Sequence, residues 1–315
     1  MQISSNTSIS INMGYAVITF YKYVQITDTI SLLNQLKVYC KEHNLKGRIL
    51  ISTEGINGGV SGTAEAVTAF KKYIRQNTLF TELTFREQPT QEIAYHNVVV
   101  RVRREVVDFG QPVNLGCVGK RIAPKVLKQW LDNKEDLVLL DARNEYETKV
   151  GRFKNAYTLP IETFRDFAQA AQQLFAVKEK KIVMYCTGGI RCEKSSAFLK
   201  QQGFKDVYQL EGGIINFTNQ FPNTYFEGSC FVFDDRIVAP VGSKEPINAC
   251  SFCPAKSDDY INCHNLDCDK LFIACASCQR KMAGTCSQEC SIAPRQRDET
   301  IQQKNVRHHH DMRHH

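Results

Sequence analysis

The sequence predicts an α/β multidomain protein built from three parts. Residues 14–110 and 121–235 both alternate strand-like and helix-like segments, but the order of these segments differs between the two. Eight of the 13 cysteines lie between residues 250 and 290 and indicate a separate Cys-rich module at 241–290. The length of 315 residues fits this division, since domains usually contain about 100–200 residues.

The composition excludes several classes of protein. No apolar run approaches the ~18 residues of a membrane span, so we expect no association with a membrane. Residues 1–13 are polar and show no secretory signal, and residues 291–315 are almost devoid of apolar side chains, so we expect both ends to be disordered. The cysteine density then favours thiolate chemistry in a reducing compartment, and we expect a cytoplasmic protein.

Residues 14–110 follow the order strand, helix, strand, strand, helix, strand. This order is typical of ferredoxin-like (acylphosphatase-like) α+β domains. Asp28 and Thr63 are placed to cap the two helices, and helical spacing predicts that Ile30 faces the core. The segment GRILISTEGINGGVSGT between the helices predicts two strands joined by a Gly/Asn turn. We expect a linker at 111–120.

Residues 121–235 alternate helices with buried strands, which predicts a parallel sheet covered on both faces. The expected elements are, in chain order, helix 124–133, strand 136–143, helix 164–175, strand 180–186, helix 192–203 and strand 207–213. In such sheets ligands bind at the carboxyl ends of the strands. Cys186 lies at such an end, directly after KIVMY.

The loop after this strand has the composition of an anion-binding site. It consists of Cys186, Thr187, Gly188, Gly189, Ile190 and Arg191. The glycines let the backbone curl so that its N–H groups point inward, and with the following helix N-terminus they favour a thiolate. We therefore expect Cys186, with a lowered pKa, and Arg191 to be catalytic. Cys192 is either a redox partner of Cys186 or a small residue packed beneath the loop.

The eight clustered cysteines predict two four-cysteine metal sites. Their spacing is Cys250-x2-Cys253, Cys263-x4-Cys268, Cys275-x2-Cys278 and Cys286-x3-Cys290. Two structural zinc ions are expected, with an iron–sulfur cluster or redox disulfides as alternatives. Either consecutive or interleaved pairs can share an ion, and His264 is an additional candidate ligand.

The central segment resembles the rhodanese domain. The four residues between Cys186 and Arg191 match the rhodanese loop, and cysteine-dependent phosphatases use a longer one. Leu140-Asp141-Ala142-Arg143 with Glu145, and Leu210-Glu211-Gly212-Gly213, match further rhodanese segments, with Arg152 replacing the common His. We expect Asp141 and Arg143 to form a salt bridge that supports the loop and does not act in catalysis.

The whole of 14–290 resembles the tRNA uridine-34 hydroxylase family, on the strings STEGINGGVSG and CTGGIRCEKS and on the order of the three parts. The resemblance implies that molecular oxygen is used to convert the wobble uridine, in the anticodon region of tRNA, to 5-hydroxyuridine. It also implies that Cys186 is essential. No GxGxxG flavin or nicotinamide motif is seen in the sequence.

Basic residues of the first domain are candidates for contact with RNA. They are Lys46, Arg48, Arg101, Arg103 and Arg104. The alternative is an ordinary solvated sheet edge. Two other functions use the same features: a sulfurtransferase that carries a persulfide on Cys186, and a non-enzymatic RNA- or protein-binding scaffold built on the zinc module.

Overall fold

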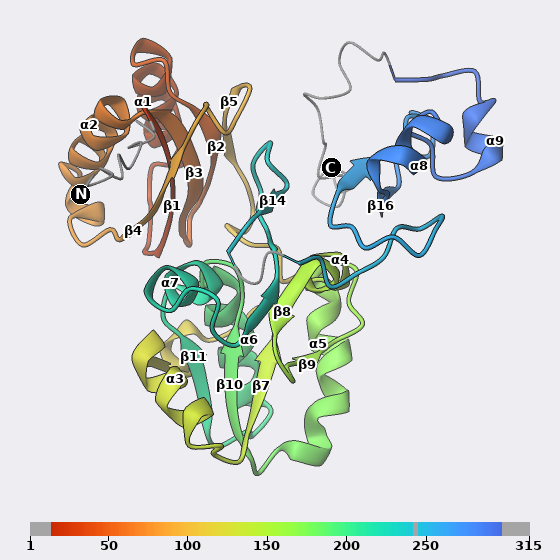
Figure 1. Cartoon of the computed structure of the whole chain (residues 1–315). Helices are drawn as coiled ribbons and strands as arrows, with labels where there is room; N and C mark the ends of the chain where they lie inside the picture. Colours follow the sequence, from red (N-terminus) through yellow and green to blue (C-terminus); the bar gives the residue numbers. More distant parts are fainter. Residues whose placement is uncertain (1–13, 242–244, 298–315) are drawn as a thin grey trace, which may run out of the picture. The chain divides into compact units, whose positions relative to one another are not determined.

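The computed structural model describes residues 14–241 and 245–297 of the chain. The described residues fall into two compact units that divide between Arg103 and Arg104 (Figure 1). The expected disordered lead at 1–13 lies outside the described residues, as does 298–315 of the expected tail. Residues 291–297 belong to the folded module instead, because Arg297 pairs with Asp269 at 2.5 Å.

The first unit is a five-stranded sheet with two helices, in the predicted order β-α-β-β-α-β followed by one more strand. The strand order across the sheet is β4-β1-β3-β2-β5, with β5 parallel to β2 and the other pairs antiparallel. Its elements are β1 (Tyr15–Tyr23), α1 (Thr29–Glu42), β2 (Lys46–Ser52), β3 (Gly55–Thr63), α2 (Ala64–Arg75), the 3-10 helix η1 (Thr78–Phe80), β4 (Phe85–Thr90) and β5 (Val98–Val102). The ferredoxin-like prediction is confirmed.

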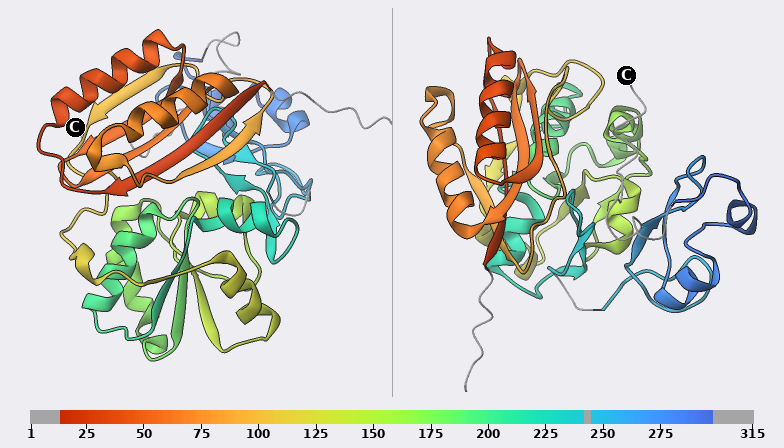
Figure 2. Two further views of the ribbon diagram at one scale, coloured as in Figure 1. Left: turned by 90° about the vertical axis from the view of Figure 1, so that its left-hand side faces the viewer. Right: turned by 90° about the horizontal axis from the view of Figure 1, so that it is seen from above.

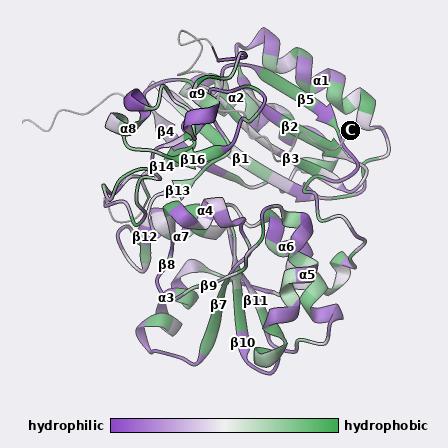
Figure 3. Ribbon diagram, turned by 90° about the vertical axis from the view of Figure 1, so that its right-hand side faces the viewer, coloured by the Kyte–Doolittle hydropathy of each residue, from purple (hydrophilic) through white to green (hydrophobic). Residues whose placement is uncertain are grey.

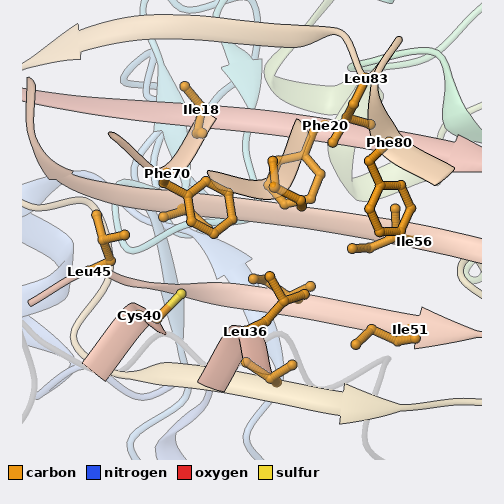
Figure 4. Packing of buried hydrophobic residues seen from close by; sticks show 14 of the residues in the cluster. Ile18, Phe20, Leu36, Cys40, Leu45, Ile51, Ile56, Phe70, Phe80 and Leu83 are labelled. Atoms are coloured by element: carbon orange, nitrogen blue, oxygen red, sulfur yellow. The ribbon is translucent and has the colours of Figure 1, made fainter. Parts of the chain in front are cut away.

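Both helices cover one face of this sheet (Figure 2). Asp28 and Thr63 cap them as predicted, accepting hydrogen bonds from the backbone amides of Ser31 and Ala66. The core between sheet and helices contains Phe20, Phe70 and Leu36, which Figure 4 shows close together. Ile30, expected in this core, is 59% exposed, because Leu32 and Leu36 occupy the buried side of α1.

The turn between β2 and β3 lies earlier in the sequence than predicted. β2 and β3 are joined at Thr53 and Glu54, so the Gly/Asn segment lies inside β3. The glycines serve close packing: a Cβ on Gly58 would lie 2.9 Å from the Phe20 ring, and one on Gly59 would lie 2.1 Å from the Tyr95 hydroxyl. Side chains at these positions would displace both rings.

The second unit begins earlier than expected. Residues 104–110 were assigned to the first domain, but Phe109 is buried in the second unit against Phe164 and Phe198, with ring centroids 5.1 and 5.7 Å away. In addition, Lys194 donates a 2.6 Å hydrogen bond to Glu105. The expected linker at 111–120 ends in a strand, because Lys120 already pairs within the central sheet.

The central sheet has five parallel strands in the order β6-β11-β10-β7-β9. Its strands are β6 (Lys120–Ile122), β7 (Leu137–Asp141), β9 (Tyr157–Thr158), β10 (Lys181–Tyr185) and β11 (Val207–Leu210). The helices of this region are η2 (Leu115–Cys117), α3 (Pro124–Asp132), α4 (Glu145–Val150), η3 (Phe164–Asp166), α5 (Phe167–Ala170), η4 (Ala171–Val177), α6 (Ile190–Gln201) and α7 (Gly213–Gln220). Figure 2 shows helices on both sides of the sheet, as predicted.

The strands β7 and β10 are predominantly hydrophobic (Figure 3) because they are buried from both sides. Ile182 and Met184 pack into one core with α5 and α6, and the alternate residue Val183 packs into the other with α3 and α7. The remaining elements are β8 (Gly151–Phe153), β12 (Phe226–Gly228), β13 (Cys230–Phe231), β14 (Val238–Ala239), β15 (Tyr260–Asn262), β16 (Leu271–Ile273), α8 (Ala276–Lys281) and α9 (Gln288–Ser291). Among the described residues, no helix has the length and apolar character needed to cross a membrane.

Candidate active site and metal centres

Cys186 directly follows β10, at the carboxyl end of the parallel sheet. The chain then turns through residues 187–189 and enters α6 at Ile190, with Gly189 in the left-handed region at φ 102°. That conformation is easily adopted only by glycine and aims the Gly189 amide at the Cys186 sulfur, 3.0 Å away. The Cys186 side chain is 1% exposed, so the sulfur lies at the bottom of the loop.

The surroundings of Cys186 stabilise its thiolate. Burial alone would raise the pKa of this thiol, but four interactions outweigh it and lower the pKa to about 5. They are a hydrogen bond from the Cys192 thiol, the positive charge of Arg191, and hydrogen bonds from the backbone amides of Arg191 and Gly189. Near neutral pH this cysteine is therefore ionised and nucleophilic.

Cys192 lies fully buried in the first turn of α6, in hydrogen-bond contact with Cys186. Burial and the neighbouring thiolate raise the pKa of Cys192 well above its ordinary value. It therefore remains a thiol and donates its proton toward Cys186. This contact is compatible with both roles considered for Cys192.

Glu147, in α4, is a site residue that the sequence reasoning missed. Its buried carboxylate accepts a hydrogen bond from Nη1 of Arg191 and a second, of 2.7 Å, from Nη2. Thr187 also approaches the carboxylate, at 3.4 Å. The match to rhodanese segments drew attention to Glu145, but the Glu145 side chain is 52% exposed and pairs with Lys149. The available signal was the spacing Asn144-x-x-Glu147, which is typical of a helix start; the Asn144 amide donates to the Glu147 carboxylate at 3.2 Å.

Asp141 and Arg143 form a fully buried ion pair beside this network. Two guanidinium nitrogens of Arg143 donate to the Asp141 carboxylate at 2.9 and 2.7 Å. Arg143 also donates to the carbonyl oxygens of Gly151, at 2.6 Å, and Glu147, at 3.5 Å. The pair is thus linked to Glu147 within α4 and to Gly151, the C-cap of that helix.

The segment Leu210-Glu211-Gly212-Gly213 closes against the Cys186 loop. The amides of Ile214 and Ile215 donate to the carbonyls of Cys186 and Thr187 at 3.0 and 3.2 Å. At Gly213, φ is 62° and an added Cβ would lie 2.3 Å from the Cys186 carbonyl oxygen. Only glycine fits at this position, which explains the motif physically.

The described residues contain two clusters of four cysteines, each able to hold a metal ion. One cluster is Cys250, Cys253, Cys275 and Cys278, and the other is Cys263, Cys268, Cys286 and Cys290. The pairs are therefore interleaved rather than consecutive. Two sulfur–sulfur distances are 3.8 Å (Cys253–Cys275) and 3.6 Å (Cys268–Cys286). A tetrahedral site with metal–sulfur bonds of about 2.3 Å has edges of about 3.8 Å, so both clusters fit a tetrahedral ion.

Backbone contacts explain the interleaving. The Ser251 amide donates to the Ile273 carbonyl at 2.9 Å, which brings the first cysteine pair beside the third. The His264 amide donates to the Gly284 carbonyl at 3.1 Å and brings the second pair beside the fourth. His264 is absent from the ligand groups found among the described residues, and its ring packs on Gly284.

In the first unit, three of the candidate RNA-binding residues share one sheet face. Ile49 and Ile51 point into the core, so Lys46 and Arg48 lie on the face opposite the helices. Leu50 pairs with Arg101 in parallel register, which places Arg101 on the same face. Arg103 follows β5, and Arg104 is the first residue of the second unit.

Aromatic residues accompany these cations. The register places Tyr21 of β1 opposite Asn57 of β3 and Asn57 opposite Leu50, so Tyr21 belongs to the same face. The Arg86 guanidinium lies 5.1 Å from the centre of the Tyr21 ring. Glu54 lies in the turn between β2 and β3.

Three families match the chain in succession. Residues 15–106 match the UPF0176 acylphosphatase-like domain, residues 123–220 the rhodanese-like domain, and residues 227–291 the rhodanase C-terminal domain. Among solved structures, the rhodanese-like domain of the Alr3790 protein from Anabaena is 23% identical. The alignment covers 45% of this chain and 90% of that one, with a TM-score of 0.31.

Curated relatives match over almost their whole length. A protein from Cytophaga hutchinsonii named tRNA uridine(34) hydroxylase is 40% identical over 289 residues, 90% of this chain and 92% of that protein. Proteins of the same name from Protochlamydia amoebophila and Chlamydia felis are each 38% identical, over 90% of this chain and 90% and 89% of theirs.

Proposed function

The chain belongs to the tRNA uridine(34) hydroxylase family, and from this premise we propose that it hydroxylates the wobble uridine of tRNA at C5 of the base. Molecular oxygen is the proposed co-substrate, and the anticodon region of tRNA is the proposed binding partner. We also assign the protein to the cytoplasm, where tRNA is available and thiolates stay reduced.

The observation that carries the proposal is the buried, ionised Cys186. A thiolate with a pKa of about 5 is available at neutral pH as a nucleophile. We propose that its sulfur adds to C6 of the uracil ring, which makes C5 nucleophilic toward an oxygen-derived oxidant. Loss of the C5 proton and departure of the thiolate then give 5-hydroxyuridine. Two electrons from an external reductant balance the second oxygen atom, which leaves as water.

The helix-free sheet face of the first unit is the proposed tRNA contact. Lys46, Arg48 and Arg101 provide cations for phosphates, and Tyr21 adds a ring on which a base can stack. We include Arg103 and Arg104, which follow β5 directly. These residues would contact the sugar-phosphate backbone and unpaired bases of the tRNA, so they would contribute affinity rather than sequence specificity.

For the two cysteine clusters we propose structural zinc. Four thiolates around a tetrahedral volume are a donor set that zinc favours, and they leave no coordination position open for substrate. Each ion joins two segments that are distant in the sequence. The small hydrophobic cluster around these cysteines would give little stability without such a cross-link.

The proposal is tested by incubating unmodified tRNA with the purified protein and a reductant, with and without oxygen, followed by nucleoside mass spectrometry. We expect uridine to gain one oxygen atom only when oxygen is present. Sulfur on the RNA, or a persulfide on Cys186 without hydroxylation, would instead identify a sulfurtransferase. Absence of both products with intact tRNA binding would support the scaffold function.

A further inference from the structure

A hydrogen-bonded turn at residues 232–237 brings Phe233 beside Arg191 of the Cys186 loop. The turn joins β13 to β14, which are both labelled in Figure 3. Val232 donates its amide hydrogen to the Ile237 carbonyl at 2.7 Å. Inside the turn, Arg236 donates from two guanidinium nitrogens to the buried Asp234 carboxylate, at 2.8 and 2.6 Å. These bonds fix the backbone that carries Phe233.

Phe233 presents an exposed aromatic ring at the edge of the active site. Its ring centre lies 5.6 Å from the guanidinium carbon of Arg191, the residue whose charge and backbone amide act on Cys186. Phe231 contacts the same ring edge-to-face at 5.6 Å, and Phe231 is itself fully buried against Tyr146. Phe233 is therefore held by its contact with Phe231, while 38% of its surface remains exposed.

The depth of Cys186 sets a requirement for its substrate. A sulfur atom on a side chain that is 1% exposed cannot attack a base that stays stacked between its neighbours. The reacting nucleotide must leave the stack, and enzymes that extrude a base hold it against aromatic or apolar side chains. Each such base–aromatic stack contributes roughly 1–3 kcal/mol.

We propose that Phe233 is a positioning residue that stacks on the extruded target pyrimidine at the entrance to the Cys186 loop. This inference rests on the proposed function and extends it to the way in which the base is held. A phenyl ring carries no hydrogen-bonding group, so Phe233 holds the base without selecting among bases. Arg191 cannot take this role, because its side chain is only 7% exposed and leaves no open face for a base.

The test compares Phe233→Leu, which keeps an apolar side chain, with Phe233→Trp, which keeps a stacking surface. Binding is measured for an anticodon stem-loop that carries either uridine or an abasic site at the target position. For the wild type and the Trp variant, we expect the abasic substitution to weaken binding about 5- to 150-fold, the equivalent of one stack. For the Leu variant, we expect uridine and abasic RNA to bind nearly equally.

Turnover provides a second measurement on the same variants. We expect Phe233→Leu to raise KM more than it lowers kcat. For Phe233→Trp, we expect a KM close to the wild-type value. Phe175→Leu is the matched control, since Phe175 is 46% exposed and also packs edge-to-face on another phenylalanine, at 5.6 Å. The pH midpoint for alkylation of Cys186 should be unchanged in every variant, which excludes damage to the loop.

The role of Phe233 would be overturned if the abasic substitution weakened binding equally in the wild type and the Leu variant. It would also be overturned if KM rose equally in the Leu and Trp variants. The binding comparison needs no turnover. If the wild type binds uridine better than the abasic RNA but forms no 5-hydroxyuridine, the proposed reaction fails while the role of Phe233 stands.

Discussion

Glu147 and Arg191 form a buried two-pronged ion pair across the Cys186 loop, with 2.7 Å between Arg191 Nη2 and Glu147 Oε1. The pair fixes the direction of the guanidinium, whose positive charge helps to lower the pKa of Cys186. It therefore joins α4, which follows β7, to the nucleophile that follows β10.

The Glu147→Gln substitution should destabilise the protein, because it leaves the Arg191 charge buried without its partner. We expect the free energy of unfolding to fall by about 3–5 kcal/mol, as measured by urea denaturation. Glu145→Gln is the matched control in the same helix. Its exposed pair with Lys149 should contribute at most about 1 kcal/mol. Similar losses for the two variants would contradict a special role for Glu147.

The pH dependence of Cys186 alkylation should report a pKa of about 5. Because this pKa is lowered relative to the unfolded chain, the thiolate persists above pH 5 and disappears as the pH falls through that value. Its contribution to stability is complete above the ordinary thiol pKa of about 8.5 and is lost as the pH falls from there to about 5. The Cys192→Ala substitution removes a hydrogen-bond donor and should move the alkylation midpoint upward. A wild-type midpoint near the ~8.5 of a free thiol would rule out the proposed stabilisation.

The metal content of double variants tests the interleaved pairing. Removal of Cys250 and Cys275 together, as serines, disrupts a single cluster and should leave one metal ion per chain by elemental analysis. Removal of Cys250 and Cys268 disrupts both clusters and should leave none. Consecutive pairing predicts the reverse result for the two proteins.

The Arg101→Gln substitution should weaken tRNA binding and reduce the slope of log affinity against log salt by about 1, the effect of one lost phosphate contact. The control is Lys72→Gln, which removes one exposed positive charge from α2 on the opposite face of the sheet. Binding isotherms at several salt concentrations give both slopes. Equal slopes for the two variants would remove the sheet face from the proposed interface.

The parts of the site that are contiguous in sequence could be predicted, and those that depend on long-range contacts could not. The loop from Cys186 to Arg191 carries its own glycines and helix start, so its geometry is encoded locally. Glu147 meets Arg191 only because β7 and β10 are adjacent strands. In the Cys-rich module, the spacing predicts which neighbouring cysteines form a pair, but it does not predict which two pairs share a metal ion.

The same reasoning explains the errors in the fold. The glycine-rich sequence of β3 resembled a turn. Glycine is required there because the rings of Phe20 and Tyr95, which come from other segments, pack closely against the strand. Likewise, the boundary expected at 110 moved to 103 because Phe109 is buried among phenylalanines far along the chain.

The most direct test of the central claim is nucleoside mass spectrometry of tRNA treated with Cys186→Ser protein. Cys117→Ser, which alters an exposed cysteine in η2, serves as the control. We predict that the Cys117 variant forms 5-hydroxyuridine at the wild-type level and that the Cys186 variant, although folded and able to bind tRNA, forms none. Wild-type amounts of 5-hydroxyuridine from the Cys186 variant would contradict the account.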